Sequence, residues 1–190
     1  GIAAAFAPSD AQAALEADLD AYVAREWTPL VESVRGTLGV GIVADPVAWT
    51  RQVDAAYRFS VPLLPFLDEA GVSVHVALFE APGLDREKAT QAVREILPAD
   101  RGHTVRFFTD PEGLAAWMRD PAFRLVCTDF TYDHRITSAG KTPLTLQEFE
   151  MGVEGAVRTL RRLVVRSRAT FFASFAPYLG RNGLAQGGAA

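Results

Sequence analysis

The chain has 190 residues, of which 49% are hydrophobic and 22% are charged, and its formal net charge is -4. This length suits one domain with a single core, and this composition is typical of a globular protein rather than a disordered one. The negative charge argues against a general affinity for nucleic acid or acidic membranes, and no apolar run approaches the roughly 18 residues that a membrane span needs. We therefore expect one domain over residues 1–190, with no membrane contact and no direct nucleic-acid contact by this segment.

The chain opens with helical patterns, which predict an N-terminal helical segment over residues 1–36. Apolar side chains recur at helical spacing between residues 10 and 27, so we expect a first helix there. Thr28 followed by Pro29 resembles a helix cap and first-turn pair, because proline gives up an N–H that has no partner at that position. A second, short helix is expected to end at Gly36.

Residues 37–143 alternate short apolar segments with longer helical patterns, which predicts a β-α-β core. One helical pattern is broken near Ser60 by two prolines, and another is preceded by Asp110 and Pro111. Strands that alternate with helices of about ten residues form β-α-β units and a mostly parallel sheet. We predict an α/β fold with a four-stranded sheet and helices on both faces, the strands covering residues 38–44, 72–80, 103–109 and 123–130.

The remaining chain predicts one long C-terminal helix over residues 144–180 and a flexible tail over 181–190. Thr145 and Glu148 have the spacing of a capping box, which places the start of the helix there. Three arginines at four-residue spacing form a basic stripe on this helix: Arg158, Arg162 and Arg166. Because Glu154 stands one turn before Arg158, we favour an ion-paired solvated face over a phosphate-binding surface.

Acidic residues follow each predicted strand, and they define the candidate ligand site. Ligands of open α/β sheets bind beyond the carboxyl ends of the strands, which singles out Asp45, Glu80, Asp110 and Asp129. Asp45 and Asp110 each precede a proline, so helix capping is the alternative explanation for both. Glu80 precedes Ala-Pro-Gly and is equally compatible with a solvent-exposed position or a place in the site.

The segment after the fourth predicted strand gathers the most chemistry-bearing residues. Asp129 is followed within five residues by Thr131, Tyr132, Asp133 and His134. Carboxylates beside a histidine could ligate a divalent metal or transfer protons near neutral pH. The spacing matches no recognised metal signature, so we assign no metal ligand. Phe130 and Trp49 are expected to supply the aromatic walls of the site.

The other reactive side chains have simpler interpretations. Cys127 is the only cysteine, so the chain forms no internal disulfide, which fits a reducing compartment and a cytoplasmic protein. We expect Cys127 to be a small buried hydrophobe rather than a nucleophile. His75, inside a strand, is expected to be structural, and His103, next to a glycine, to lie in an exposed turn. Gly140-Lys141-Thr142 is not a phosphate-binding loop, because Arg135 stands where the first glycine is required.

Three functions are compatible with this pattern. The first is a small-molecule-binding domain, such as the ligand-sensing part of a transcriptional regulator whose DNA-binding module lies outside these residues. The second is a hydrolase or lyase that uses Asp129, Asp133 and His134, with or without a divalent metal. The third is a homodimeric interaction protein that pairs through Phe171 and Phe175 of the C-terminal helix. No motif identifies the ligand or a cofactor.

Overall fold

The computed structural model describes residues 10–45, 63–128, 133–145 and 148–179. At its centre is a sheet of five strands in the order β3-β2-β1-β4-β5, and every neighbouring pair is parallel. The strands are β1 (Gly39–Ala44), β2 (Ser73–Phe79), β3 (Thr104–Phe108), β4 (Leu125–Cys127) and β5 (Thr142–Leu144). The α/β class and the parallel sheet are therefore confirmed, with one strand more than predicted.

Helices cover both faces of the sheet, as the apolar strand sequences require. The larger core lies on the face covered by α2 (Thr28–Val34), α4 (Leu63–Glu69), α5 (Arg86–Arg94) and α8 (Gly152–Ser167). The smaller core lies on the opposite face, under α6 (Pro111–Met118) and α7 (His134–Ser138). Side chains alternate between the two: Val74 and Val76 of β2 face the larger core, and Ala77 faces the smaller one.

The chain winds outward from β1 in two directions, which makes this a doubly wound sheet. From β1 to β2 to β3 the chain passes through α4 and α5 on one face, then from β3 to β4 to β5 through α6 and α7 on the other. The strand order therefore reverses between β1 and β4. At this reversal, the connection that follows β1 covers one face of the sheet, and the connection that follows its neighbour β4 covers the opposite face.

Two glycines in β1 allow the chain around Phe123 to approach the sheet closely. A Cβ on Gly39 would lie 2.1 Å from the carbonyl oxygen of Ala122, and one on Gly41 would lie 2.8 Å from the Phe123 ring. Trp117 stacks on Phe123 with ring centroids 4.6 Å apart, so the two rings fill the space that a larger β1 side chain would occupy. The glycines of this strand thus serve packing.

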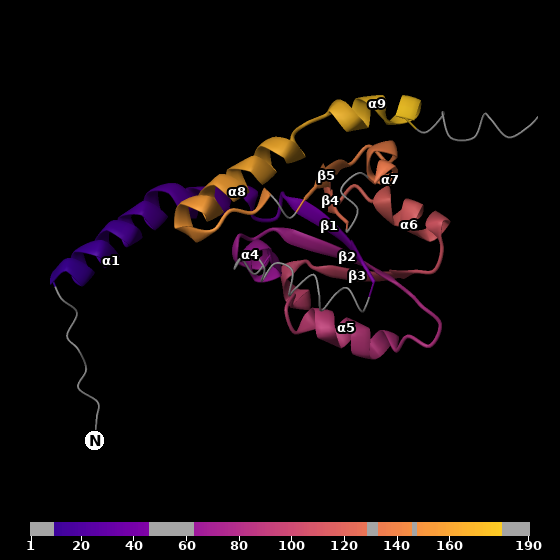
Figure 1. Cartoon of the computed structure of the whole chain (residues 1–190), viewed down its shortest axis with the longest axis horizontal. Coiled ribbons are helices and arrows are strands. Elements are labelled where there is room, and N and C mark those ends of the chain that lie inside the picture. Colours follow the sequence, from indigo (N-terminus) through magenta and orange to yellow (C-terminus); the bar gives the residue numbers. More distant parts are fainter. Residues whose placement is uncertain (1–9, 46–62, 129–132, 146–147, 180–190) are drawn as a thin grey trace, which may run out of the picture.

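The predicted N-terminal helical segment is confirmed, but Thr28 does not cap a second helix, because its backbone is helical and its hydroxyl donates to the Val23 carbonyl at 3.3 Å. α1 (Asp10–Tyr22) continues through a π-helical turn, η1 (Val23–Trp27), into α2, which ends just before Gly36. Figure 1 shows α1 projecting away from the sheet, and its residues from 12 to 21 are exposed. Within the described ranges, no helix is both long enough and apolar enough to cross a bilayer.

The single long C-terminal helix predicted over residues 144–180 is wrong, because two helices occupy this segment. They are α8, which begins only at Gly152, and α9 (Phe171–Leu179), which lies at the far end of the molecule from α1 (Figure 1). Thr145 does donate its N–H to the Glu148 carboxylate at 3.2 Å, as in a capping box, but this bond does not mark the start of α8. Phe149 is buried in the core, where its ring contacts Phe66. This contact keeps the backbone at residue 149 out of a helical conformation.

The interval between the fourth predicted strand and Thr145, expected to be a loop, contains α7 and the short edge strand β5. These elements have five and three residues, too few for a periodic pattern. Pro143 lies inside β5, which is compatible with an edge position. A further short element, the 3-10 turn η2 (Ala99–Arg101), precedes β3. The helix expected after Asp45, the end of the fourth predicted strand and the tail after residue 180 lie outside the described residues.

Candidate functional site

The parallel sheet brings the carboxyl ends of all five strands to one edge, as predicted. Asp45 follows β1 and Thr128 follows β4, and these two strands are direct neighbours. Glu80 follows β2 on the other side of β1, whereas Asp110 follows the edge strand β3. The predicted residues Asp45, Glu80 and Asp110 are therefore in one row. Among the described residues, only Asp45 and Thr128, which was not predicted, flank the reversal of strand order.

Asp110 is the N-cap of α6. Its Oδ1 accepts the Gly113 N–H at 2.7 Å, and its Oδ2 accepts the Thr109 hydroxyl at 2.9 Å. The Gly113 N–H and then the Thr109 hydroxyl lower the pKa of this carboxyl below its usual value. Of the two explanations that the sequence left open, the geometry supports capping.

Glu80 belongs to an ion pair at the carboxyl edge. The Arg86 guanidinium contacts both carboxylate oxygens, with Nε 2.6 Å from Oε1. This hydrogen bonding lowers the pKa of Glu80. The pair joins the end of β2 to the first turn of α5, so Glu80 is directed toward its own crossover connection.

Asp133 is buried and fully engaged by its own helix. Its Oδ1 accepts the Arg135 N–H at 3.0 Å, and its Oδ2 lies 2.6 Å from Nη2 of the same arginine. Burial alone would raise the pKa of Asp133, but the hydrogen bonds from Arg135 outweigh it and leave the pKa below its usual value. The carboxyl therefore stays ionised at neutral pH and is poorly suited to act as a general acid. His134, the first residue of α7, is exposed.

The other predicted ligand-binding residues, Asp129, Thr131 and Tyr132, lie outside the described residues, as do Phe130 and Trp49. Across the part of the chain that the structure describes, no three histidine, cysteine, aspartate or glutamate side chains gather as metal ligands.

The prediction that His103 lies in an exposed turn is wrong. Its side chain is 1% exposed, and its Nδ1 accepts the Val74 N–H at 3.0 Å. Its Nε2 lies 2.9 Å from Oδ1 of Asp68, which also pairs with Arg101. The imidazole thus joins the end of α4 to the starts of β2 and β3, a structural role that no local sequence pattern indicates.

His75 is structural, as expected, but one of its nitrogens is unsatisfied. Nδ1 lies 3.0 Å from the Thr104 hydroxyl, and within the described chain the buried Nε2 has no hydrogen-bond partner. The ring packs against Phe123 with centroids 5.3 Å apart. Burial lowers the pKa of His75, so the neutral imidazole is favoured.

Lys141 is a buried cation that sequence reasoning considered only as a failed phosphate-loop motif. Its Nζ donates to the carbonyl oxygens of Asp120 at 2.5 Å and Phe123 at 2.6 Å. Burial lowers the pKa of the amine, while nearby Asp120 opposes this shift. Lys141 therefore ties the turn between α6 and β4 to the start of β5.

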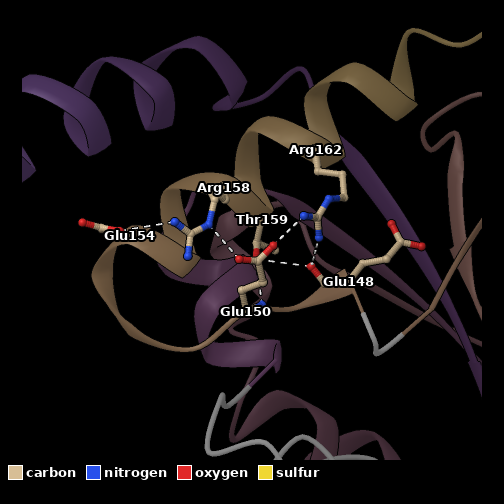
Figure 2. Close-up of polar contacts among 6 residues, drawn as sticks. All are labelled: Glu148, Glu150, Glu154, Arg158, Thr159 and Arg162. Carbon is tan, nitrogen blue, oxygen red and sulfur yellow. Dashed lines mark hydrogen bonds and ion pairs between the residues drawn. The ribbon is translucent and has the colours of Figure 1, made fainter.

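The basic stripe on α8 is ion-paired, as predicted (Figure 2). Glu150 lies between two arginines, with its carboxylate oxygens 2.7 Å from Arg158 Nε and 2.5 Å from Arg162 Nη2. Hydrogen bonds from Arg158 and then Arg162 lower the pKa of Glu150. Thr159 is buried, and its hydroxyl accepts the Glu150 N–H at 3.0 Å. The network fastens residues 148–150 to α8.

The fold and the carboxyl edge together define an open, doubly wound α/β domain whose strand order reverses between β1 and β4. Comparisons with protein-family models, curated proteins and solved structures gave no match.

Proposed function

We propose that this chain is a small-molecule-binding α/β domain whose ligand site lies at the carboxyl ends of β1 and β4. The supporting observation is the strand order β3-β2-β1-β4-β5, with crossover connections on opposite faces on the two sides of β1. In doubly wound sheets, neighbouring loops separate at such a reversal, and ligands bind between them. Asp45 and Thr128 flank this position and offer a carboxylate and a hydroxyl, which suit ligands that carry amines or hydroxyls.

The proposal includes a sensing role in the cytoplasm, as part of a transcriptional regulator. Binding at the end of β1 would act on the larger core, to which β1 contributes Val40 and Ile42 and α2 contributes Val31 and Val34. Because α2 continues into the projecting α1, a shift in this core would move α1 relative to the sheet. Such a coupling requires the ligand to bind more tightly to the domain when α2 is in one position than when α2 is in another.

Thermal-shift screening of amines, sugars and small acids, followed by calorimetry of the best ligand, tests the site. We expect Asp45→Asn and Thr128→Val each to weaken that ligand roughly tenfold or more, the loss typical of a hydrogen bond to a charged or buried polar group. Asp110→Asn is the matched control: asparagine caps helices as well as aspartate does, and Asp110 follows the edge strand. If Asp110→Asn weakens binding as much as Asp45→Asn, the site is misplaced.

The hydrolase or lyase alternative receives no support from Asp133, since Arg135 occupies both of its carboxylate oxygens. The homodimer alternative does have a supporting observation. Phe171, Phe175 and Tyr178 of α9 are 60%, 47% and 69% exposed, and neighbouring rings contact each other in tilted pairs with centroids 4.8 and 6.4 Å apart. Exposed aromatic side chains that are contiguous are typical of interaction surfaces. A homodimer through α9 is therefore a second candidate, compatible with ligand binding.

A further inference from the structure

A cavity of about 600 Å³ lies at the amino ends of β1 and β4, the opposite edge of the sheet from the proposed ligand site. The end of α2, the start of β1, the segment before β4 and the end of α8 line it. The lining residues that matter here are Ser33, Thr37, Arg124, Ser167 and Arg168. Its volume falls within the range of small-molecule sites, about 300–1,000 Å³.

Two arginines of this cavity have unused hydrogen-bonding capacity. The guanidinium groups of Arg124 and Arg168 have no hydrogen-bond or ion-pair partner among the described residues, and no carboxylate lines the cavity. The arginines of α8 itself differ, because each pairs with a glutamate: Arg158, Arg161, Arg162 and Arg166. In a chain of net charge -4, two unpaired cations at one cavity form a local positive site.

Two other charged groups, Lys141 and Asp120, make hydrogen bonds within the chain. Lys141 lies close enough for Arg124 to act on it electrostatically, but its Nζ donates to two backbone carbonyls. Asp120, which also acts on Lys141, accepts the Ala122 N–H at 2.9 Å. Neither group lines the cavity, so neither neutralises the two arginines directly.

The three hydroxyls of the cavity are oriented by the ends of the two helices. Ser33 donates to the Leu30 carbonyl at 2.7 Å, Thr37 to the Val34 carbonyl at 3.1 Å, and Ser167 to the Val164 carbonyl at 2.8 Å. Each hydroxyl hydrogen is therefore used, and the oxygen is left as an acceptor. The Val34 carbonyl at the end of α2 also accepts the N–H groups of Thr37 and Leu38 at 3.0 Å, so it is satisfied by the chain itself.

We propose that this cavity binds a small organic anion that carries hydroxyl groups, such as a phosphorylated sugar or a hydroxycarboxylic acid. Arg124 and Arg168 bind the anionic group, because the planar guanidinium donates two parallel hydrogen bonds to carboxylate or phosphate oxygens. The ligand hydroxyls donate to the oxygens of Ser33, Thr37 and Ser167. The arrangement selects against a neutral sugar, which leaves the arginines unpaired, and against bare phosphate, which leaves the hydroxyl acceptors unused.

Calorimetric titration of the full chain with glucose 6-phosphate, citrate, inorganic phosphate and glucose tests this proposal. We expect glucose 6-phosphate, citrate or both to bind at least tenfold more tightly than inorganic phosphate, and glucose not to bind. Arg124→Gln and Arg168→Gln should each weaken binding roughly tenfold to a hundredfold, the range for lost hydrogen bonds to charged groups. Neither side chain has a hydrogen-bond or ion-pair partner in the part of the chain that the structure describes, so circular dichroism should show folded variants.

Arg119→Gln is the matched control, because this exposed arginine also has no ion-pair partner in the described structure and does not line the cavity. Equal weakening by Arg119→Gln, equal binding of inorganic phosphate, or binding of neither organic anion overturns the proposal. Asp45→Asn separates this site from the one at the carboxyl edge. It should leave anion binding unchanged, and anion binding that Asp45→Asn removes would contradict the assignment to the amino edge.

Discussion

His75 is a buried imidazole whose Nε2 has no hydrogen-bond partner among the described residues, and its position predicts how stability responds to acid. Burial lowers its pKa in the folded state below the ordinary value of 6.5, while neighbouring Asp120 partly opposes the shift. The unfolded chain therefore binds a proton first as the pH falls. The contribution of His75 to the free energy of unfolding should be at its full value above pH 6.5 and should decrease as the pH falls below that value.

Urea denaturation between pH 5 and 7.5 measures this effect. We expect His75→Phe, which retains a ring against Phe123, to flatten the pH dependence in this window, and His134→Gln, at an exposed site, to leave it unchanged. The carboxyls whose pKa is lowered lose their contribution below their ordinary values of 3.8 to 4.5, outside the window. A His75→Phe variant with the same pH dependence as the parent would contradict this account.

The two glycines of β1 predict graded losses of stability. Alanine at position 41 would meet the rings of Phe123 and Trp117 at 2.8 and 2.9 Å, and overpacking of this kind costs about 1–3 kcal/mol. Alanine at position 39 would meet the backbone oxygen of Ala122 at 2.1 Å, which no rotamer change can relieve. Gly39→Ala should therefore destabilise the fold more than Gly41→Ala in urea denaturation.

A double variant tests the cause. Phe123→Leu should cost less in the Gly41→Ala background than in the parent, because the smaller side chain makes room for the new methyl group. If the losses of stability add up in the double variant, contact with the Phe123 ring is not the cause of the destabilisation by Gly41→Ala.

At the scale of elements, the start of α8 depends on a buried hydroxyl. Thr159 is 1% exposed and accepts the Glu150 N–H. Thr159→Val leaves this N–H without a partner, which costs about 1–3 kcal/mol. Thr90→Val, the same change at a partly exposed position inside α5, should be nearly neutral. Chemical denaturation measures both, and hydrogen exchange at the Glu150 amide should accelerate only in Thr159→Val.

The same region explains why the C-terminal helix was predicted with the wrong boundaries. Thr145 and Glu148 do interact, but Arg166 also holds Glu148, and Phe149 is drawn into the core. These contacts come from α8 and α4, so a capping pattern read from neighbouring residues could not detect them. The helix with a strong local signal was better predicted, because α6 begins at its Asp110 cap as the pattern of Asp110 and Pro111 indicated.

At the scale of the whole molecule, α9 predicts self-association. Its inner side approaches α7, where a Cβ on Gly140 would lie 3.2 Å from Ala173, and its aromatic side is exposed. We expect Phe171→Glu with Phe175→Glu to convert a dimer to a folded monomer in sedimentation velocity. Leu15→Glu, on the exposed α1, is the control and should leave the sedimentation coefficient unchanged. A parent chain that sediments as a monomer at high concentration removes the homodimer candidate.

The sequence by itself determined the α/β class, the parallel sheet, four of its strands and the ion-paired face of α8. These features depend on periodicity and on partners within a few helical turns, which a linear sequence displays. Only the tertiary structure decided the strand order, the fifth strand, the division of the last helix and the burial of His103 beside Asp68, 35 residues away. It also brought Arg124 and Arg168 to the lining of one cavity. Such contacts form when the whole chain folds and buries its apolar surface together. They join residues that are far apart in the sequence, so no local sequence pattern predicts them.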